Sequence, residues 1–177
     1  MQFDNYNIRL LQNSDIDAYY KMVSKNRKRL EDFFTGTTSR TKTFEDTKVF
    51  LAEMLERVNK REYFPYIIED TKTNTIAGFL DLKNVDWKIP KTEMGLYIDE
   101  DYAGKGISTK AFILFCKHCF KTQGFRKLFL RTHPENYSAR KIAEKAGFRI
   151  EGTIRCDYKT TSGKLVDLIY YGKLNDD

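Results

Sequence analysis

Hydrophobic and polar residues follow two different periods on either side of a glycine-rich turn near the middle of the chain. Between positions 92 and 99, apolar side chains alternate with polar or small ones, which is the period of a β-strand. From position 107 onward they recur at the spacing of one helix face. Gly104 and Gly106 lie between the two patterns. The pattern predicts a strand at 92–99 and a helix at about 106–122, joined by a glycine turn.

The same periods predict the other elements. Strands are expected at 6–11, 63–69, 75–82 and 127–132, with a closing hairpin around 160–163, and helices at 16–34, at 44–58 and from Asn136 onward. Ser14 with Asp17, and Thr43 with Asp46, have the residue types and spacing of helix-capping pairs. The polar stretch 36–41 is expected to be a loop. This order is an antiparallel meander followed by a β-α-β-α-β run and a closing strand, which indicates a mixed α/β fold with helices on the faces of one sheet.

The composition is that of a globular protein. Of its 177 residues, 41% are hydrophobic and 32% are charged, and no repeat or long linker interrupts them, so we expect one domain over residues 1–177. The N-terminal segment lacks the apolar core of a signal peptide, and no apolar run is long enough to span a bilayer. We therefore expect a cytoplasmic protein with no membrane partner.

The three cysteines do not predict a metal site or a disulfide framework. Their number is odd, and nothing in the sequence directs the chain to an oxidising compartment, so reduced thiols are expected. Cys116, His118 and Cys119 have a spacing that suggests zinc, but they lie inside a predicted helix. His133 and Cys156 are isolated, so no second ligand pair exists and no metal is predicted.

The charge of the chain gives only a weak preference for anionic partners. The formal net charge is +6, and the densest basic cluster lies at 25–29. Such a cluster is typical of a solvated helix face, with contact to an acidic protein, to ribosomal RNA or to a coenzyme A phosphate as the functional alternatives. Tyr63, Phe64 and Tyr66 would suit an RNA-binding sheet, but an ordinary sheet core explains them better. No nucleic acid partner is expected.

The glycine turn has the features of a phosphate-binding loop. Glycines accept positive φ angles and let an anion approach the backbone, and the first amides of the following helix have no partner within it. The helix dipole favours negative charge at the same place. An ordinary turn between a strand and a helix would have a similar sequence. The turn lacks the third glycine of a dinucleotide fingerprint and the Gly-Lys-Ser/Thr ending of a nucleotide triphosphatase.

A second segment, at 136–148, changes this picture. Together with the glycine turn it resembles the GNAT superfamily of acetyl-CoA-dependent N-acetyltransferases, in which the first segment is the pyrophosphate loop and the second is a helix that starts near Asn and ends in Gly-Phe. The strand at 93–98 and the exit at 147–152 are also similar to this family. The segments 8–11 and 163–171 resemble the RimJ/RimL branch, which acetylates ribosomal-protein N-termini, so the resemblance covers nearly the whole chain.

The resemblance implies a fold and a set of coenzyme contacts. The GNAT fold has a central mixed, mostly antiparallel seven-stranded sheet with a splayed parallel strand pair and about four helices on its faces. Acetyl-CoA would be the co-substrate, with its pyrophosphate held by the backbone of the loop and with Lys105 adding positive charge. The pantetheine would bind the strand before the loop, and Asn136 would act both as a helix cap and as a pantetheine contact. The implied coenzyme residues are Leu96, Tyr97, Ile98, Gly104, Lys105, Gly106, Ile107, Ser108 and Asn136.

The catalytic groups are less clear from the resemblance. Glu93 occupies the position where many relatives have an acid that binds water and serves as the base, although it could also be a strand glutamate that faces solvent. The usual proton donor for the leaving thiolate is a tyrosine, and its position here is Ala143. Ser138, Tyr137 or Ser108 could replace it, while Tyr137 could equally be an exposed residue at a helix start. Asp101 stands where the family has Gln or Arg, and we expect it to point away from the loop.

The resemblance implies acetyl transfer by direct attack of a primary amine on acetyl-CoA. The acceptor would be a protein N-terminal amine, with ribosomal proteins as the candidate class. A polyamine or an aminoglycoside is the alternative acceptor, and acids at 31, 32, 45 and 46 could provide a local cationic pocket. A third reading, which Ala143 keeps open, is a non-catalytic acyl-CoA-binding protein. The acceptor pocket would be built from residues 33–41 and 158–163, and the chain would be a monomer or a homodimer.

Overall fold

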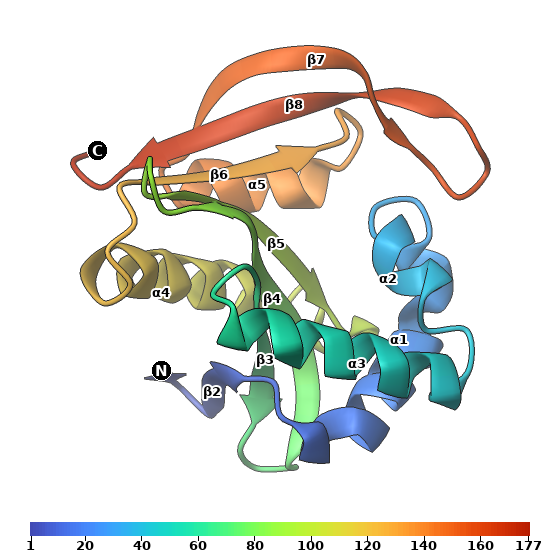
Figure 1. The fold of residues 1–177 in the computed structure, drawn as a ribbon. Coiled ribbons are helices and arrows are strands. Elements are labelled where there is room, and N and C mark those ends of the chain that lie inside the picture. The colour runs from blue at the N-terminus through green and yellow to red at the C-terminus, as the bar shows by residue number, and fades with distance from the viewer.

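One sheet of eight strands organises the chain, in the order β1-β2-β3-β4-β5-β6-β8-β7 (Figure 1). The computed structural model describes residues 1–177. The strands are β1 Gln2–Phe3, β2 Tyr6–Leu10, β3 Phe64–Asp70, β4 Thr75–Asp86, β5 Lys91–Ile98, β6 Lys127–Thr132, β7 Arg149–Lys159 and β8 Leu165–Leu174. The helices are α1 Ile16–Leu30, α2 Thr35–Ser39, α3 Phe44–Asn59, α4 Ile107–Lys121 and α5 Tyr137–Lys145. Neighbouring strands are antiparallel except β5 and β6, and no helix has the length and apolar character needed to cross a bilayer.

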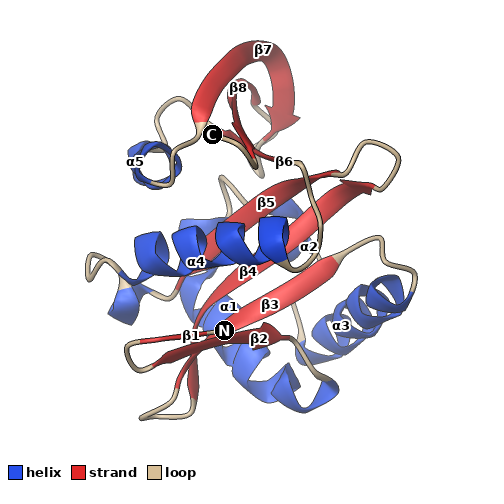
Figure 2. Cartoon of the chain, turned by 90° about the vertical axis from the view of Figure 1, so that its left-hand side faces the viewer, coloured by secondary structure: helices blue, strands red, loops and turns tan.

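Helices cover both faces of the sheet (Figures 1 and 2). Side chains alternate along a strand, so Met94 and Tyr97 of β5 lie on opposite faces of the sheet. Met94 packs in the core beneath α4, and Tyr97 packs in the core beneath α1 and α3. The first core includes Phe112, Phe115 and Ala143, and the second includes Tyr19 and Phe79. Both cores hold residues of the central strands, so the sheet is fixed from two sides.

The expected mixed sheet is confirmed, but it has one strand more than the seven expected. The added strand is β1, a short edge strand that pairs with β2 through Gln2–Asn7 and Phe3–Tyr6. Two residues carry too little periodicity to be predicted as a strand. The splayed parallel pair is also present, as described below.

The structure has five α-helices where about four were expected, because the stretch 36–41, expected to be a loop, contains most of α2. Its threonines stabilise this short helix by bonding to their own backbone. Thr38 is buried, and its hydroxyl donates to the carbonyls of Phe34 and Thr35. The first helix correspondingly ends at Leu30 and does not continue to position 34.

One of the two expected caps is confirmed. Thr43 and Asp46 form a capping box, with the Asp46 amide donating to Thr43 Oγ1 and the Thr43 amide donating to Asp46 Oδ2, each at 3.1 Å. The prediction that Ser14 and Asp17 form the other cap is wrong. Asp15 takes the role instead: it accepts from the Gln12 amide at 2.8 Å and forms an ion pair with Arg9 at 2.8 Å. Asp15 is thus held before the first helix both by a local bond from Gln12 and by the ion pair with Arg9 of β2.

Strands β5 and β6 pair over a short distance and then separate. Their parallel register consists of Lys91–Lys127, Thr92–Leu128 and Glu93–Phe129. Beyond that point β5 continues only against β4, and β6 continues only against β8. The second half of β5 therefore has one backbone edge that no neighbouring strand covers, and an opening lies between the two strands.

Candidate active site

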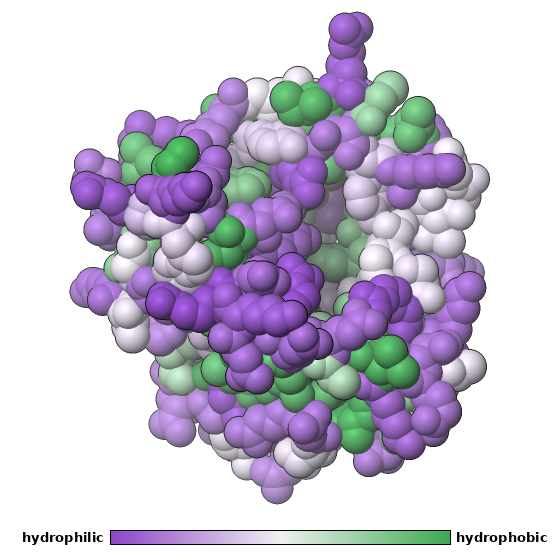
Figure 3. Space-filling model, in the orientation of Figure 1, coloured by the Kyte–Doolittle hydropathy of each residue, from purple (hydrophilic) through white to green (hydrophobic).

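A cleft of about 800 Å³ lies where β5 and β6 separate. Its walls come from β5, from the glycine turn with the start of α4, from β6, from α5 and from the end of α1. Figure 3 shows the molecule hollowed on this side, with many hydrophilic residues around the opening. The cleft volume is in the range of small-molecule and cofactor sites.

The glycine turn gives the cleft a set of free backbone donors. Gly104 and Gly106 have φ angles of 75° and 77°, in the left-handed region that favours glycine. The amides of residues 104–109 donate to no backbone acceptor of the chain, and Gly106 caps α4 without a side-chain bond. Free amides at the positive end of a helix dipole bind anions, so the turn has the properties of a phosphate site.

The side chains of the loop divide between the cleft and other surroundings. Ser108 lines the cleft together with both glycines. Ile107 is buried in the α4 core, so only its backbone could contact a ligand. Lys105 lies outside the cleft wall, with its ammonium 5.6 Å from the centre of the Tyr102 ring.

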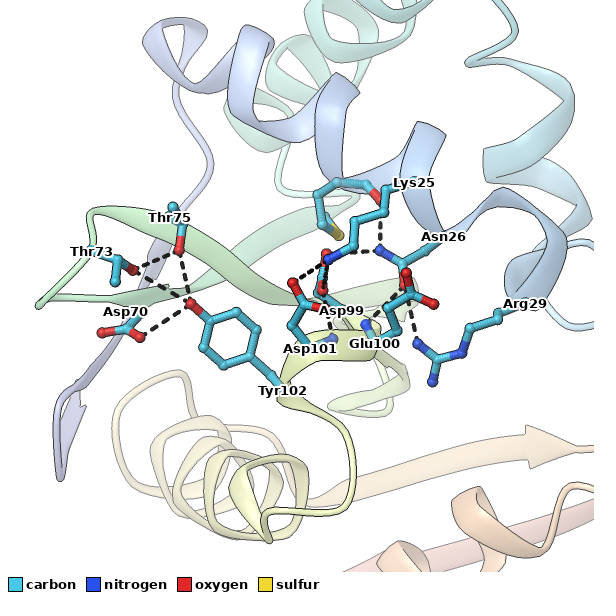
Figure 4. Close-up of polar contacts among 11 residues, drawn as sticks. Lys25, Asn26, Arg29, Asp70, Thr73, Thr75, Asp99, Glu100, Asp101 and Tyr102 are labelled. Atoms are coloured by element: carbon cyan, nitrogen blue, oxygen red, sulfur yellow. Dashed lines mark hydrogen bonds and ion pairs between the residues drawn. The ribbon is translucent and has the colours of Figure 1, made fainter.

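A polar network fixes the segment that leads into the loop (Figure 4). Asn26 is 1% exposed; its side-chain amide donates to Asp99 at 2.9 Å, and its Oδ1 accepts from the Glu100 amide at 2.9 Å. Lys25 bridges Asp99 and Asp101, at 2.8 and 2.5 Å. Burial of Asp99 opposes ionisation, but the bonds from Lys25, the Asp101 amide and Asn26 lower the pKa of this carboxyl below its usual value. The network holds Asp101 against α1, away from the loop, as expected.

Tyr102 provides a second anchor on the opposite side of the same segment (Figure 4). Its hydroxyl lies 3.1 Å from Asp70 and 2.9 Å from the hydroxyl of Thr75, at the two ends of the turn that joins β3 and β4. The segment before the glycine turn is thus tied to α1 on one side and to the sheet on the other.

Leu96, Tyr97 and Ile98 lie on the part of β5 that has left β6, and all three line the cleft. The phenol of Tyr97 nevertheless points into the core beneath α1, where it is 5% exposed and donates to the Tyr19 hydroxyl at 3.1 Å. Burial raises the pKa of Tyr97 well above its usual value, so the phenol stays neutral. The contribution of these three residues to the cleft is therefore mainly their backbone edge.

Glu93 lies at the last β5–β6 pair and is 3% exposed, so the interpretation as a solvent-facing glutamate is wrong. Its carboxylate accepts from Arg131 at 3.1 Å and from the Asn84 side chain at 2.6 Å, with the Lys83 ammonium 3.6 Å away. Burial opposes the charge on Arg131, but the bond and the charge of Glu93 raise the pKa of the guanidinium above its usual value. Glu93 is thus a buried anion with several cationic and polar partners.

Sequence reasoning had not singled out Lys83, Asn84 or Arg131. They reach Glu93 from the two neighbouring strands, and the register of β4 and β5 shifts between Lys83 and Asp86. Asn84 has a φ angle of 50°, which this irregularity explains. One signal in the sequence could have found Arg131: side chains alternate along the strand predicted at 127–132, and this alternation puts Arg131 on the same face as Phe129 and opposite Leu130.

The start of α5 brings two of the expected residues to the cleft and leaves one outside it. Asn136 caps the helix by accepting from the Ala139 amide at 3.2 Å, and it lines the cleft together with Ser138. Tyr137 is 64% exposed, lies outside the cleft wall and has the Arg140 guanidinium 5.7 Å from its ring centre. Ala143 is fully buried in the α4 core, so its position is part of the packing in this chain.

Comparison with known proteins identifies this arrangement. The family model for the acetyltransferase (GNAT) domain matches residues 6–149. The chain belongs to the GNAT acetyltransferase family. The family uses acetyl-CoA, and the chain is an acetyltransferase enzyme.

Two relatives of this acetyltransferase span nearly all of its length, and a third covers less than half. The Bacillus subtilis protein named "Putative ribosomal N-acetyltransferase YdaF" is 25% identical over 173 residues, which are 97% of this chain and 92% of that protein. The solved structure of ribosomal-protein-S5-alanine acetyltransferase from Vibrio fischeri superposes with a TM-score of 0.91 and 25% identity, over 100% of this chain and 97% of that one. The spermidine N(1)-acetyltransferase of Escherichia coli K12 is 30% identical over 82 residues, 46% of this chain and 44% of that protein.

The side of the acetyltransferase cleft opposite the loop is closed by a contact between distant segments. Tyr158 of β7 lines the cleft, and its hydroxyl lies 2.8 Å from Thr35 Oγ1 and 3.0 Å from the Thr35 amide. Thr161 donates to the Glu31 carbonyl at 2.5 Å. Phe33 and Phe34 complete this wall. The structure thus brings together the two segments from which the acceptor pocket was expected to be built.

Basic residues outnumber acidic ones on the wall of the acetyltransferase cleft. The acids are Asp32 and Glu93, and the bases are Lys28, Arg29, Lys83, Arg131, Lys141 and Lys145. The cleft therefore suits ligands that carry negative charge, as coenzyme A does.

Proposed function

We propose that this GNAT enzyme transfers acetyl from acetyl-CoA to the N-terminal amine of a protein, a ribosomal protein being the first candidate. The observation that carries the coenzyme half is the set of free amides at 104–109 beside the uncovered edge of β5. In this proposal the amides bind the pyrophosphate, the backbone of Leu96, Tyr97 and Ile98 pairs with the pantetheine as a further strand would, and Asn136 contacts it from α5.

The chemistry of the proposed reaction needs three events. The acceptor nitrogen loses a proton and attacks the acetyl carbonyl, an amide of β5 stabilises the oxyanion, and the carbon–sulfur bond breaks as the thiolate is protonated. We assign the carboxylate beside the acceptor amine to Glu93, which lies where β5 and β6 separate and would order a water there. Ser138 is proposed as the proton donor to the thiolate because it lines the cleft. Tyr137, outside the cleft wall, is the second choice for that role.

The acceptor class rests on the charge of the cleft and on the relatives. A polyamine needs several unpaired acids, and this cleft has two acids among six bases. Of the four acids considered for a cationic pocket, Glu45 pairs with Lys48, Asp46 caps α3 and Glu31 lies outside the cleft wall, which leaves Asp32 on that wall. Two of the relatives that span almost the whole chain, at 25% identity each, are named for ribosomal acetylation.

Spermidine is the second candidate acceptor, because the spermidine acetyltransferase of E. coli is similar over 82 residues. A panel of amines separates the two. Purified protein is given acetyl-CoA with peptides that begin in Ala or Ser, with the same peptides blocked at the N-terminus, and with spermidine or an aminoglycoside. Thiol release and peptide mass are measured.

Acetylation of the free peptides, with no reaction of the blocked ones, is the expected result. Turnover with spermidine alone would contradict the acceptor class. Saturable coenzyme binding with no transfer to any amine would contradict the catalytic proposal itself.

A further inference from the structure

Asn26 is a buried residue in the C-terminal half of α1, and its side-chain amide uses its full hydrogen-bonding capacity. The residue is 1% exposed. Its Nδ2 donates to the Met22 carbonyl at 2.8 Å and to Asp99 Oδ2 at 2.9 Å. Its Oδ1 accepts from the Glu100 amide at 2.9 Å and from Arg29 Nη1 at 3.1 Å. Asn is a poor helix former and a buried amide is costly unless it is bonded, so these four bonds compensate for its presence there.

The turn at Glu100–Tyr102 is the last fixed part of the backbone before the glycine loop. Within it, the Tyr102 amide donates to the Asp99 carbonyl at 3.0 Å. The Ala103 amide then donates to the Glu100 carbonyl at 3.1 Å. Among all residues outside 99–103, Asn26 is the one that bonds the backbone of this turn. Helix α1 therefore fixes, through one side chain, the place where the backbone enters the loop.

The loop has no support of its own between this turn and α4. Gly104 and Lys105 make no backbone hydrogen bond within the chain. A Cβ atom at Gly104 or at Gly106 would meet no atom within 4 Å, so no packing holds the backbone there either. Free amides bind an anion well only when they converge on it. The direction of the amides at 104–109 therefore depends on the two fixed ends of the loop.

The surroundings of Asn26 fix which way its amide points (Figure 4). Two donors, the Glu100 amide and the Arg29 guanidinium, face Oδ1, while two acceptors face Nδ2. Both charged partners strengthen this orientation, because bonds to charged groups are stronger than neutral ones. Arg29 also lines the cleft next to Asn26, and Lys25 holds Asp99 from the far side at 2.8 Å. A reversed amide would put donors against donors and acceptors against acceptors.

We propose that Asn26 is a positioning residue for the coenzyme, an inference that rests on the proposed coenzyme site. Through the Glu100 amide it sets the place of the amides that bind the pyrophosphate. All four of its hydrogen bonds are made within the protein, so none is left for a ligand. Changes at Asn26 should therefore alter coenzyme affinity and leave the chemical step almost unaffected.

The test exchanges the two bonded side chains, Asn26 and Asp99. Asn26→Asp places a second carboxylate against Asp99 and should raise the KM for acetyl-CoA by about 10-fold, with kcat at saturating coenzyme within about 2-fold of the wild type. Asp99→Asn leaves two amide donors facing each other and should raise the same KM.

The double variant Asn26→Asp with Asp99→Asn restores the bond in the opposite direction. Asp at position 26 still accepts from the Glu100 amide, and the net charge is unchanged. The KM for acetyl-CoA should return to within about 3-fold of the wild type, although the bond to the Met22 carbonyl is lost. A role in folding alone would give no such recovery of coenzyme affinity.

Val23→Ala is the control for a general loss of stability. Val23 lies one turn earlier on α1, is 0% exposed in the core beneath α1 and α3, and does not line the cleft. The change should lower the temperature of thermal unfolding and leave the KM for acetyl-CoA unchanged. The Kd for coenzyme A, from calorimetry, and thermal unfolding are measured for every variant.

Three results would overturn the inference: a wild-type KM in Asn26→Asp, a double variant that binds coenzyme no better than Asp99→Asn, or an equal rise of KM in Val23→Ala. If Asn26→Asp does not fold, the comparison of the double variant with Asp99→Asn still decides. A wild-type protein that binds no coenzyme A would instead refute the proposed function, and that result is distinct from all three.

Discussion

The proposed coenzyme side and the proposed acceptor side of the cleft are built in different ways. On the coenzyme side, the free amides come from one continuous stretch, residues 104–109, at the start of α4. On the acceptor side, Tyr158 contacts Thr35 across 123 positions of sequence, and Lys83, Glu93 and Arg131 come from three different strands. The first side depends on backbone conformation, and the second depends on side chains that the fold brings together. The donor of a reaction can therefore be read from a short motif, while the acceptor requires the tertiary structure.

The largest expected effect is on the acceptor side. Arg131→Leu leaves Glu93 buried without its guanidinium partner, which costs about 3–5 kcal/mol of unfolding free energy in comparable pairs. Chemical denaturation of this variant measures the loss. The double variant Arg131→Leu with Glu93→Leu should recover part of it, since the buried carboxylate is removed with its guanidinium, while Lys83 loses Glu93 and Asp157 loses Arg131. If Arg131→Leu were as stable as the wild type, the ion pair between Arg131 and Glu93 would not contribute to the stability of this side of the cleft.

The second effect tests the backbone on the coenzyme side. Gly106→Val places a β-branched residue at a φ angle of 77° and should raise the KM for acetyl-CoA by about 10-fold or more, with a smaller effect on acceptor KM. Gly124→Val is the matched control, because Gly124 has a φ angle of 79° and lies outside the cleft wall. It should carry the same folding cost without the kinetic effect. Equal coenzyme KM values in the two variants would refute the assignment of the loop.

A third effect concerns the network that holds the loop. The pKa of Asp99 is lowered in the folded protein, so its ionised form contributes stability above the unfolded value near 4, and that contribution is lost as the pH falls through the folded value. Asp99→Asn should lower stability at pH 7 by about 1–2 kcal/mol and flatten the loss of stability toward acid pH. Unfolding measured between neutral and acid pH gives both numbers. A variant whose stability falls with pH as steeply as the wild type would contradict this role.

The smallest effect is expected for Tyr158→Phe, which removes the hydroxyl that reaches Thr35. One hydrogen bond contributes about 1 kcal/mol, so the acceptor KM should rise by roughly 5-fold while the KM for acetyl-CoA stays unchanged. Initial rates with each substrate varied separately measure both. A change in coenzyme KM alone would show that the two sides are not separable.

The contrast between local backbone features and side chains that the fold brings together also explains which features the sequence could predict. The strand at 92–99, the glycine turn and α4 follow one another along the chain, so periodicity and residue type locate them with little help from the rest of the fold. The capping box at Thr43 is equally local. The pair Ser14 and Asp17 was the wrong choice: Asp15 has this role, bonded to the Gln12 amide and to Arg9 on another element. The partners of Glu93 were missed because strand register, including the shift near Asn84, is a property of the assembled sheet.

The separated strands also couple coenzyme binding to the stability of the whole protein. Because β5 and β6 share only three paired positions, the two halves of the sheet are joined there by a short seam. A molecule that pairs with the uncovered edge of β5 and contacts α5 connects the halves and binds the folded chain only. Its concentration then enters the folding equilibrium directly, adding about 2.7 kcal/mol when it is present at about 100 times its dissociation constant. In a cell, acetyl-CoA bound in this way would thus stabilise the folded enzyme as well as serve as its substrate.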